Sequence, residues 1–502
     1  MNFKPSETLS LKEVNRGLNL VIKDGLAAEA MSVLTGGTFL VAMSVMLGAS
    51  NFQIGLLAAL PTFTNIFQLI AIWLVQRYNN RKAVAVLTNI LARFPLLVIG
   101  SLPFLFSTGT SIQVLIFLLF FHYFFGSIAG ASWNSWMKDL VPEEKLGSYF
   151  AQRTRLTQTL NVIFSLLLAL ALDHIKKYYA QQELATYSVM FISGGLLGIL
   201  GTYVLSKTPE PSSYLSKENL VKLFAKPLKD KNFRKLLFFN SSWTFALNLA
   251  TPFFIVYMMN SIHLPLSYII GFGVLSQLAG IVAVKMWGNY SDKFSNKTII
   301  RIAAPIYIAS IIAWSFVGLS GHFVVGLCFI GLINILTGVA SSGVNLAITN
   351  IGIKLSPKDE AIVYLSARNM IVAFISALGP LAGGLLADYF AKKDFAWSVH
   401  LGKYNFHLLH LHDFGFLFLI GGLLAIAALR TIRSVKEEGE VDKDLAVGEL
   451  RVVFKKRVKN SFTKQMLRSL LYSPITYPKS QKKRIKRRVI TMKHKRSLNN
   501  IA

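Results

Sequence analysis

The sequence predicts an all-α polytopic membrane protein, with about twelve transmembrane helices in two pseudo-symmetric six-helix bundles. Three observations lead to this fold class. Hydrophobic residues make up 53% of the chain and charged residues only 15%, which is outside the usual range of soluble globular proteins. Apolar runs of about 20 residues, enough to cross about 30 Å of hydrocarbon, recur until about residue 432. Features of the first half also recur in the second half at a nearly constant spacing.

The apolar runs divide into two sets of six, and each run is long enough to form one membrane-spanning helix. The predicted spans are 26–48, 53–75, 84–106, 112–135, 156–174, 186–206, 236–258, 268–289, 299–318, 322–346, 369–391 and 413–432. The first 25 residues contain no short apolar stretch with a small-residue cleavage site. We therefore expect the first helix itself to direct the chain to the membrane.

The repeat is clearest in the loops that follow the second and eighth spans. The loop that begins at Gln76 matches the loop that begins at Asp292, and Ile54-Gly55 matches Ile270-Gly271 at the same spacing. A second block recurs at a spacing shorter by a single position, so that Pro142, Tyr149, Arg153 and Asp173 correspond to Pro357, Tyr364, Arg368 and Asp388. The chain thus reads as two copies of one membrane module. We expect bundles at 1–206 and 236–432, a linker at 207–235 and a basic tail at 433–502.

The distribution of basic residues predicts the orientation of the chain in the membrane. Loops at about 49–52, 107–111, 259–267 and 319–321 contain no Lys or Arg, whereas the alternate connections are rich in both. Because basic loops concentrate on the cytoplasmic side, both termini and the linker are predicted to be cytoplasmic. We expect a plasma membrane location, which in a bacterium is the inner membrane.

The formal charge of +29 is concentrated in the tail, where residues 430–502 hold 21 basic and six acidic residues. Residues 450–471 alternate apolar and basic side chains, as an interfacial helix would. We favour a contact between this tail and anionic inner-leaflet lipids. A disordered tail that only fixes topology is the alternative, and nucleic-acid binding is not expected.

One of the repeated loops carries a recognisable signature. Residues 288–297 resemble the loop signature of the major facilitator superfamily, G-x-x-x-D-(R/K)-x-G-x-(R/K), with Ser295 at the second Gly. In the first-half copy, Ile72, Gln76 and Asn79 replace the first Gly, the Asp and the second Gly. The loop at 139–153 is also similar to the corresponding loop of that superfamily. The resemblance covers about residues 15–432.

The resemblance implies a secondary active transporter, in which two bundles rock around a central site and expose it alternately to each side. It also implies a cytoplasmic gate at the signature loops. The gate candidates are Gly288, Asp292, Lys293, Lys297, Arg77 and Arg81. Asp292 would latch the outward-facing state, whereas Gln76 cannot form an ion pair at the matching position. The alternative is that these charges only enforce topology.

The run Gly379-Pro380-Leu381-Ala382-Gly383-Gly384 matches a G-P-x-x-G-G motif associated with antiporters. That motif belongs in the fifth helix, whereas this run lies in the eleventh. We interpret it as a site of close helix packing through small residues.

Few ionisable groups lie within the predicted spans. Among the acidic residues only Glu29 is clearly inside a span, with Asp24 at its edge. Glu29 is thus the candidate carboxylate for proton coupling, although a carboxylate near a helix N-terminus would also be favoured by the helix dipole. His122, in the fourth span, is the second candidate proton carrier, and a structural hydrogen-bonded histidine is its alternative.

Polar residues near the middle of other spans are candidates for the substrate cavity: Asn65, Asn248, Gln277, Asn334 and Arg93. The four amides could bind a polar solute or could only join helices. An arginine at such depth needs a partner, so Arg93 either forms a structural pair or binds an anionic group.

Other chemistry is not indicated. Cys328 is the only cysteine, which excludes intrachain disulfides and a cysteine-based metal site. His400, His407, His410 and His412 gather in the last outer loop, where we expect a loop or interfacial role. The chain has no G-x-x-x-x-G-K-(S/T) loop, so ATP-driven transport is disfavoured. We expect no enzymatic activity, no cofactor and no metal.

The leading hypothesis is secondary active transport of a small solute by a monomer, with proton coupling through Glu29 or His122 left open. The alternatives are transport of a lipid or other amphiphile, and a non-transporting receptor or scaffold that acts through its basic tail. The sequence names neither the substrate nor the coupling ion.

Overall fold

Long helices dominate the structure, a computed structural model that describes residues 5–7, 9–212, 226–319, 322–357, 360–391, 393–401, 404–412 and 414–437. Within these residues, 12 helical segments are long and apolar enough to cross a membrane. The fold is therefore that of a polytopic helical membrane protein, as the sequence predicts.

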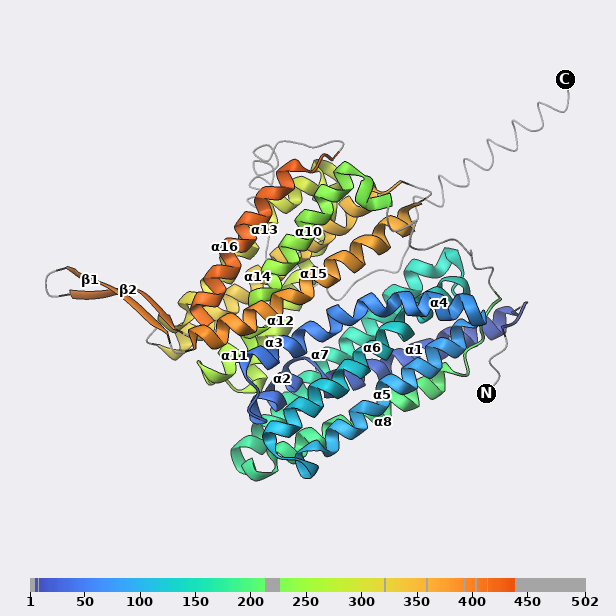
Figure 1. Cartoon of the computed structure of the whole chain (residues 1–502), viewed down its shortest axis with the longest axis horizontal. Coiled ribbons are helices and arrows are strands. Elements are labelled where there is room, and N and C mark those ends of the chain that lie inside the picture. The colour runs from blue at the N-terminus through green and yellow to red at the C-terminus, as the bar shows by residue number, and fades with distance from the viewer. Residues whose placement is uncertain are drawn as a thin grey trace, which may run out of the picture. The chain divides into compact units, whose positions relative to one another are not determined.

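The helices up to residue 205 form the first half of the molecule (Figure 1). Its elements are α1 (Leu11–Thr35), α2 (Gly37–Met46), α3 (Asn51–Phe63), the 3-10 turn η1 (Thr64–Phe67), α4 (Gln68–Tyr78), α5 (Arg81–Leu105), α6 (Thr108–Leu140), α7 (Leu146–Tyr178) and α8 (Glu183–Leu205).

The helices from residue 231 onward form the second half. Its elements are α10 (Lys231–Ala250), α11 (Phe253–Asn260), α12 (Leu266–Phe294), α13 (Asn296–Ala313), the 3-10 turn η4 (Trp314–Leu319), α14 (Phe323–Leu355), α15 (Ala361–Phe390), β1 (Asp394–Leu401), β2 (Tyr404–His412) and α16 (Phe414–Thr431).

Neighbouring helices follow the same order in both halves. In the first half α7 lies beside α1, α1 beside α8, α8 beside α5, and α5 beside α6. In the second half α15, α10, α16, α13 and α14 adjoin one another in the matching order, followed by α12. The repeated tyrosines also occupy matching places. Tyr149 donates a hydrogen bond to the Leu18 carbonyl (2.9 Å), and the Tyr364 ring meets the Phe233 ring at 4.8 Å.

The first helix is longer than its predicted span. It begins at Leu11 rather than at residue 26, and Ser10 and Glu13 form a capping box at its N-terminus. Hydropathy detects only the apolar part of this helix and misses the amphipathic turns that precede it. Asp24 therefore lies inside the helix and is buried. The interpretation of Glu29 as a helix-end carboxylate is wrong, because Glu29 lies about five turns after the first residue of the helix.

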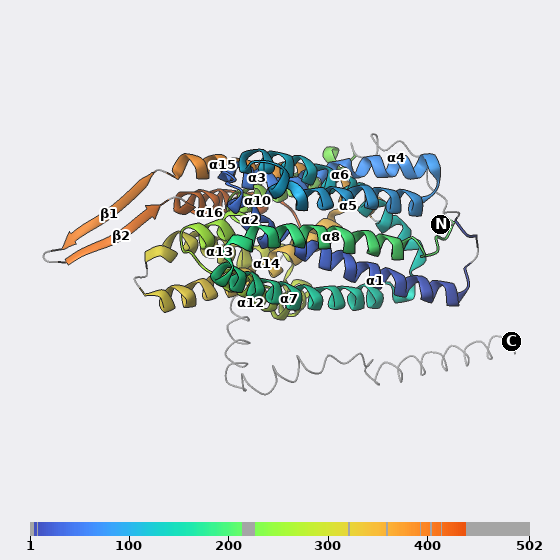
Figure 2. The same cartoon turned by 90° about the horizontal axis from the view of Figure 1, so that it is seen from below.

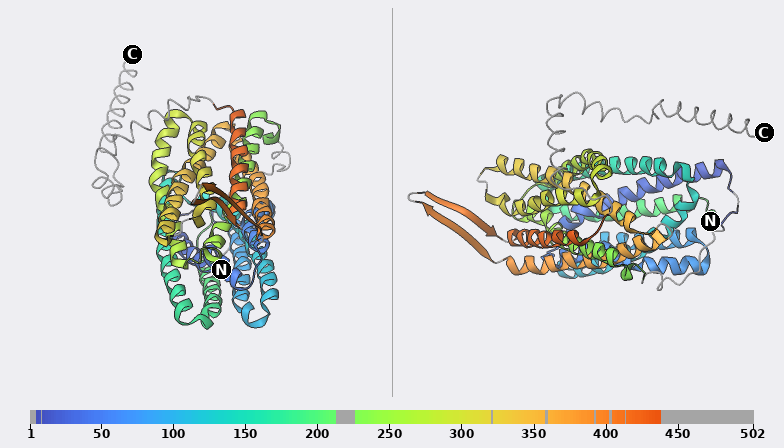
Figure 3. Two further views of the ribbon diagram at one scale, coloured as in Figure 1. Left: turned by 90° about the vertical axis from the view of Figure 1, so that its left-hand side faces the viewer. Right: turned by 90° about the horizontal axis from the view of Figure 1, so that it is seen from above.

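The last predicted outer loop contains a β-hairpin, so the fold is not strictly all-α. Strands β1 and β2 pair antiparallel from Asp394↔His412 to Leu401↔Tyr404. Figures 2 and 3 show this hairpin extending beyond one end of the helices. The four clustered histidines lie on these strands, and their side chains are outside the described residues. We call this end the hairpin side and the opposite end, where α1 begins and α8 ends, the linker side.

Candidate functional site

The two halves are joined on the hairpin side by a carboxylate that binds the start of a helix in the other half. Asp388, near the end of α15, accepts hydrogen bonds from the backbone N–H groups of Asn51 and Phe52, both at 3.0 Å. These are the first two residues of α3. The first N–H groups of a helix lack partners within it and carry partial positive charge, so a carboxylate is well suited to bind them.

The same arrangement occurs a second time with the halves exchanged. Asp173, near the end of α7, accepts hydrogen bonds from the backbone N–H groups of Leu266 and Ser267, both at 2.9 Å. These residues begin α12, whose N-cap residue Pro265 supplies no side-chain acceptor. Asp173 and Asp388 are the residues related by the second repeated block of the sequence. The pseudo-symmetry of the sequence thus appears as a reciprocal pair of carboxylate–helix contacts, which we call the clasps.

Glycines bring α3 and α15 close together beside one clasp. A Cβ atom added to Gly384 of α15 would lie 2.6 Å from the Asn51 carbonyl oxygen, and one added to Gly55 of α3 would collide with the Pro380 carbonyl. Gly379 and Gly383 contact α10 within the same half. The run 379–384 is therefore a site of close helix packing, as the sequence predicts.

Contacts between the halves favour the hairpin side. The hairpin-side segments α2 and α3 lie against α11, α12 and α15 of the second half. The linker-side continuations of the same spans behave differently, because α1 packs against α7 and α8, and α4 packs against α5 and α6. The first two spans thus touch the other half along their hairpin-side segments and their own half along the remainder.

On the linker side, each half has a carboxylate that binds a helix start within the same half. Glu210, after α8, accepts hydrogen bonds from the backbone N–H groups of Arg81 (2.8 Å) and Lys82 (3.2 Å) at the start of α5. The buried Arg81 guanidinium also bonds Glu210 (3.2 Å) and forms an ion pair with Asp139 at the end of α6. The start of the linker is thereby fixed to the first half.

Glu437, after α16, has the matching role in the second half. It accepts hydrogen bonds from the backbone N–H groups of Asn296 (3.2 Å) and Lys297 (2.7 Å), which begin α13. Lys354 of α14 forms an ion pair with it at 3.1 Å. Burial alone would raise the pKa of Glu437, but the hydrogen bonds from Lys297, Asn296 and Lys354 outweigh burial and hold its pKa below the usual value.

The signature loops are tighter than the sequence suggested. Helix α12 continues to Phe294 and α13 begins at Asn296, so Ser295 alone makes the turn, with φ of 90°. Asn79, at the corresponding position in the first half, has φ of 48°. Both residues occupy positions where the signature has glycine, which adopts positive φ without a steric penalty.

The gate candidates are distributed around these turns. Gly288 lies within α12, and Arg77 lies in the last turn of α4. The Lys297 ammonium donates hydrogen bonds to the carbonyls of Arg433 (3.3 Å) and Val435 (2.9 Å). The Lys293 ammonium lies 5.2 Å from the centroid of the neighbouring Phe294 ring. The side chain of Asp292 is outside the described residues. Arg81 and Lys297 thus anchor segments of their own halves.

Polar pairs join the first and fifth spans of each half. Asn161 of α7 donates a hydrogen bond to the carboxylate of Glu29 in α1 at 2.7 Å. In the second half, Asn248 of α10 donates to the hydroxyl of Ser376 in α15. Asn161 and Ser376 have the same spacing in the sequence as Asp173 and Asp388. The fifth-span partners therefore correspond through the repeat, whereas Asn248 lies about one turn beyond the position that matches Glu29.

The remaining amide candidates differ in their partners. Gln277 of α12 binds Gln158 of α7, across the two halves and one helical turn from Asn161. Asn65 accepts a hydrogen bond from Gln68 at 3.1 Å where η1 interrupts the second span. Asn334 donates to the Ile330 carbonyl of its own helix at 2.9 Å.

Arg93 and His122 lie within the first half. The Arg93 guanidinium is 3.9 Å from the carboxylate of Asp24, and both residues are buried, with 4% and 5% of their surfaces exposed. His122 contacts the Ala92 carbonyl through Nδ1 at 2.6 Å. Arg93 thus has the buried partner that an arginine at this depth requires.

The contacts of Asp173, Asp388, Glu210, Glu437 and Asn161 were not predicted from the sequence. The two aspartates were visible as members of the repeat, and their position at helix ends was the available signal. The glutamates follow the last helix of each half, but the second lies farther along the chain than the repeat spacing would place it.

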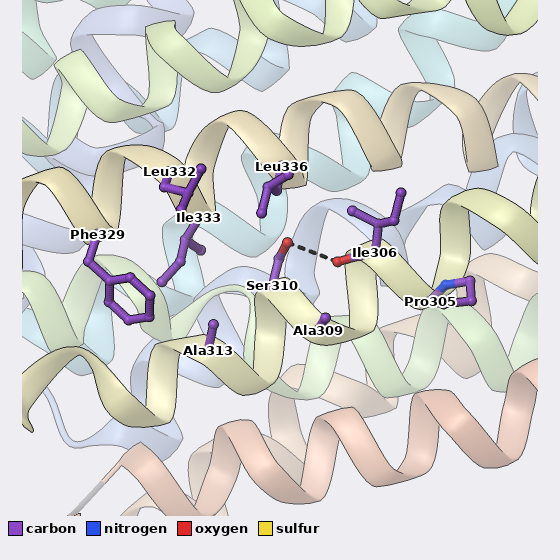
Figure 4. A pocket seen from close by; sticks show the side chains of 9 residues that line it. All are labelled: Pro305, Ile306, Ala309, Ser310, Ala313, Phe329, Leu332, Ile333 and Leu336. Carbon is purple, nitrogen blue, oxygen red and sulfur yellow. Dashed lines mark hydrogen bonds between the residues drawn. The ribbon is translucent and has the colours of Figure 1, made fainter. Parts of the chain in front are cut away.

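An apolar pocket of about 420 Å³ lies between α13 and α14 (Figure 4). Its lining residues are Pro305, Ile306, Ala309, Ser310, Ala313, Phe329, Leu332, Ile333 and Leu336. The one polar side chain, Ser310, donates its hydrogen bond to the Ile306 carbonyl at 2.9 Å. The pocket suits an apolar occupant and does not include the polar pairs.

Twelve helices in two matching sets, all within the described residues and long enough to span a membrane, define a multi-pass membrane protein. The chain belongs to the Major Facilitator Superfamily, whose family model matches residues 26–380. No curated protein sequence matches the chain.

Solved transporter structures share the fold at low sequence identity. The crystal structure of the nucleoside transporter NupG has a TM-score of 0.58 and 12% identity, and covers 85% of this chain and 99% of its own. A POT family transporter in complex with a thioalcohol-conjugated peptide gives 0.59 and 11%, with coverages of 84% and 96%. The inward-open xylose transporter XylE from E. coli gives 0.54 and 14%, with coverages of 85% and 97%. At such identities the likeness shows the fold alone.

Proposed function

We propose that this protein is a secondary active transporter of a small polar solute, and that the bundles at 1–206 and 236–432 rock against each other as rigid bodies. The reciprocal clasps of Asp173 and Asp388 are the observation that supports this proposal most strongly. Each clasp ties a helix end of one bundle to a helix start of the other, so both must break when the hairpin side opens. Alternating access requires such a gate.

The linker side is proposed to be cytoplasmic, on the basis of its basic loops. The hairpin side then faces outward, and the clasped state is inward-facing. Asp292 is proposed to act in the opposite, outward-facing state, as the family signature implies. The tail beyond residue 437 lies outside the described residues and is proposed to contact anionic lipids. Deleting residues 440–502 without loss of membrane association or transport would contradict that role of the tail.

The substrate is proposed to contact amides that both halves supply, Asn65, Asn248 and Gln277. Gln277 is supported by its bond to Gln158 across the halves, since a solute between them could replace one partner. Asn334 and Arg93 are weaker candidates, because Asn334 binds its own helix and Arg93 is buried against Asp24.

Glu29 is proposed as the coupling carboxylate. It is only partly buried, and its hydrogen-bond partner Asn161 is a neutral amide rather than a cation. Protonation would therefore change the bond between α1 and α7 without leaving a buried cation unpaired. His122 is the weaker candidate, because its Nδ1 is committed to the Ala92 carbonyl.

The experiment begins with thermal-shift screening of the purified protein against nucleosides, sugars, amino acids, peptides, organic anions and amphiphiles. Uptake of the stabilising solute is then measured in proteoliposomes with an imposed pH gradient. Glu29→Gln is expected to abolish accumulation driven by the gradient while retaining solute exchange, and Glu13→Gln on the same helix serves as the control. Gradient-driven accumulation at the wild-type rate by Glu29→Gln would contradict coupling at Glu29. Absence of flux for every stabilising solute would contradict transport itself.

A further inference from the structure

The interior of the first half contains a cluster of charged groups that neither the clasps nor the polar pairs use. Asp24 of α1 and Arg93 of α5 are both buried within it. Arg153 of α7 places its guanidinium carbon 4.9 Å from the centroid of the Trp133 ring, and its Nε lies against Gly25, the residue after Asp24. Three helices thus bring two guanidinium groups and one carboxylate together.

Glycines make room for these charged groups. A Cβ atom added to Gly25 would lie 2.8 Å from Arg153 Nε, and one added to Gly198 of α8 would lie 2.8 Å from Arg93 Cδ. At Gly201, also on α8, it would lie 3.2 Å from Asp24 Oδ1. Larger residues at these positions would displace the charged side chains.

The cluster has unused hydrogen-bonding capacity. Arg93 Nε and Nη1, Arg153 Nε and Asp24 Oδ1 are buried without a hydrogen-bond partner among the residues that the structure describes. The separation of 3.9 Å between Arg93 and Asp24 is too long for a hydrogen bond. Buried polar groups in native proteins are almost always satisfied by protein, water or an ion. Three donors in the described part of this bundle therefore still need an acceptor.

The charges in the cluster are also unbalanced. Two arginines, of which Arg93 is buried and Arg153 half-buried, face one aspartate. Among the neighbouring titratable groups, His122 binds the Ala92 carbonyl, the Tyr149 hydroxyl binds the Leu18 carbonyl, and the Glu29 carboxylate, one turn after Gly25, accepts a hydrogen bond from Asn161. Buried donors without an acceptor are costly, so an anion that accepts from both arginines would stabilise the cluster.

The corresponding place in the second half contains fewer charged groups. At the repeat spacing, Asp24, Arg93 and Arg153 correspond to Asn240, Ala309 and Arg368. Arg368 donates through Nη1 to the Ile348 carbonyl at 3.1 Å and through Nη2 to Asn369 at 3.2 Å. The second half thus has one arginine with protein acceptors, whereas the first has two arginines with unused donors.

We propose that a small inorganic anion of the halide class binds between Arg93 and Arg153 inside the first half. Arg93 Nε and Nη1 and Arg153 Nε are its donors, and Asp24 limits its affinity through repulsion. Ordered water would satisfy the same hydrogen bonds without responding to chloride.

The test is the melting temperature of the full-length purified protein, followed by tryptophan fluorescence while sodium chloride replaces sodium gluconate at constant ionic strength. A saturable rise with chloride is expected for the wild type and for the control Lys285→Gln, which removes an exposed cation of α12. Arg153→Gln should abolish the rise. Asp24→Asn should lower the half-saturating chloride concentration about tenfold, because it removes a charge that repels the anion. A tenfold change corresponds to about 1.4 kcal/mol of interaction free energy.

The two variants act in opposite directions, so a folding defect in one does not remove the test. A melting temperature that is equal in chloride and gluconate would overturn the proposal in favour of ordered water only. So would an unchanged half-saturation in Asp24→Asn, or a full chloride response in a folded Arg153→Gln protein.

Discussion

The Asp388 carboxylate binds the backbone N–H of Asn51, far earlier in the chain, at 3.0 Å. This bond and its counterpart from Asp173 to Leu266 connect the two halves at their hairpin-side ends. Neither bond requires a side-chain partner, because the helix start supplies the donors and the positive charge. Such a contact can form and break without leaving a second ionised group buried, which suits a gate that must open in every transport cycle.

Close approach of α3 and α15 should depend on Gly384. Gly384→Ala places a Cβ atom 2.6 Å from the Asn51 carbonyl oxygen, so the helices must separate there. We expect the variant to weaken closure of the hairpin side and to label faster with a membrane-impermeant thiol reagent at a cysteine replacing Phe52, in a Cys328→Ser background. Gly271→Ala is the control, because its added Cβ meets no described atom within 4 Å. Equal labelling rates in the two variants would contradict the packing role.

The turn between α12 and α13 should store backbone strain. Ser295 adopts φ of 90° and ψ of 153°, a region that is essentially restricted to glycine and costs about 1–3 kcal/mol for other residues. Ser295→Gly loses a side-chain cap worth only a few tenths of a kcal/mol relative to glycine, so a net stabilisation of about 1–2 kcal/mol is expected. Asn79→Gly should change stability less, because asparagine tolerates φ of 48°. A lower melting temperature for Ser295→Gly than for the wild type would contradict this account.

Glu437 should make a pH-dependent contribution to stability. Its folded-state pKa is depressed, so its contribution is complete above the unfolded value of 4.5 and is lost as pH falls through the folded value. Glu437→Gln should cost about 2–3 kcal/mol at pH 7, as expected for hydrogen bonds to a charged group. The difference in melting temperature from the wild type should be flat between pH 8 and about 5 and shrink below about 4.5.

The control for Glu437 is Glu360→Gln, which removes an exposed ion pair with Lys226 and should cost less than about 1 kcal/mol. If the difference in melting temperature between Glu437→Gln and the wild type grows as the pH is lowered, its sign is wrong for a depressed pKa. That result would contradict the role given to Glu437.

The buried pair of Asp24 and Arg93 should show strong coupling. Arg93→Ala alone removes the ion-pair partner of the buried Asp24 carboxylate and should cost about 3–5 kcal/mol. The double variant Asp24→Asn/Arg93→Ala reproduces the residues of the second half, Asn240 and Ala309, and should recover most of that loss. The melting temperatures of the two single variants and the double variant form the test cycle. Additive losses would show that the two side chains do not stabilise each other.

The sequence was sufficient to predict the spans and the repeat, because hydropathy and spacing are local or periodic properties. The extension of α1 to Leu11 was missed, since its charged first turns lack the apolar signal of a span. That error hid the partner of Arg93, because Asp24 was placed at the edge of the membrane rather than inside a helix.

The clasps were beyond sequence reasoning for a different reason. Asp173 and Asp388 were visible as a repeated pair, but their partners are backbone N–H groups in the other half, which carry no residue signature. The polar pairs were half predicted. Glu29 and Asn248 were singled out by their depth, whereas their partners Asn161 and Ser376 depend on how the helices face each other.

We propose that the clasps hold the hairpin side closed. Replacing both aspartates, as Asp173→Asn/Asp388→Asn, keeps their shape and removes their charge. Each replacement is expected to remove about 1.4 kcal/mol from the closed state of the hairpin side. The equilibrium between the closed and open states should therefore shift about tenfold when one aspartate is replaced and roughly a hundredfold when both are replaced. Asp230→Asn is the matched control, because Asp230 caps α10 within its own half.

The most direct measurement is a pair of spin-label distances in a Cys328→Ser background. One pair of labels replaces the exposed residues Tyr179 and Phe323 on the hairpin side, and the other replaces Tyr78 and Ile353 on the linker side. In the double aspartate variant, the hairpin-side distance should lengthen and the linker-side distance should shorten, while Asp230→Asn changes neither. Unchanged distances in the double variant, or two distances that change in the same direction, would contradict a gate held by Asp173 and Asp388.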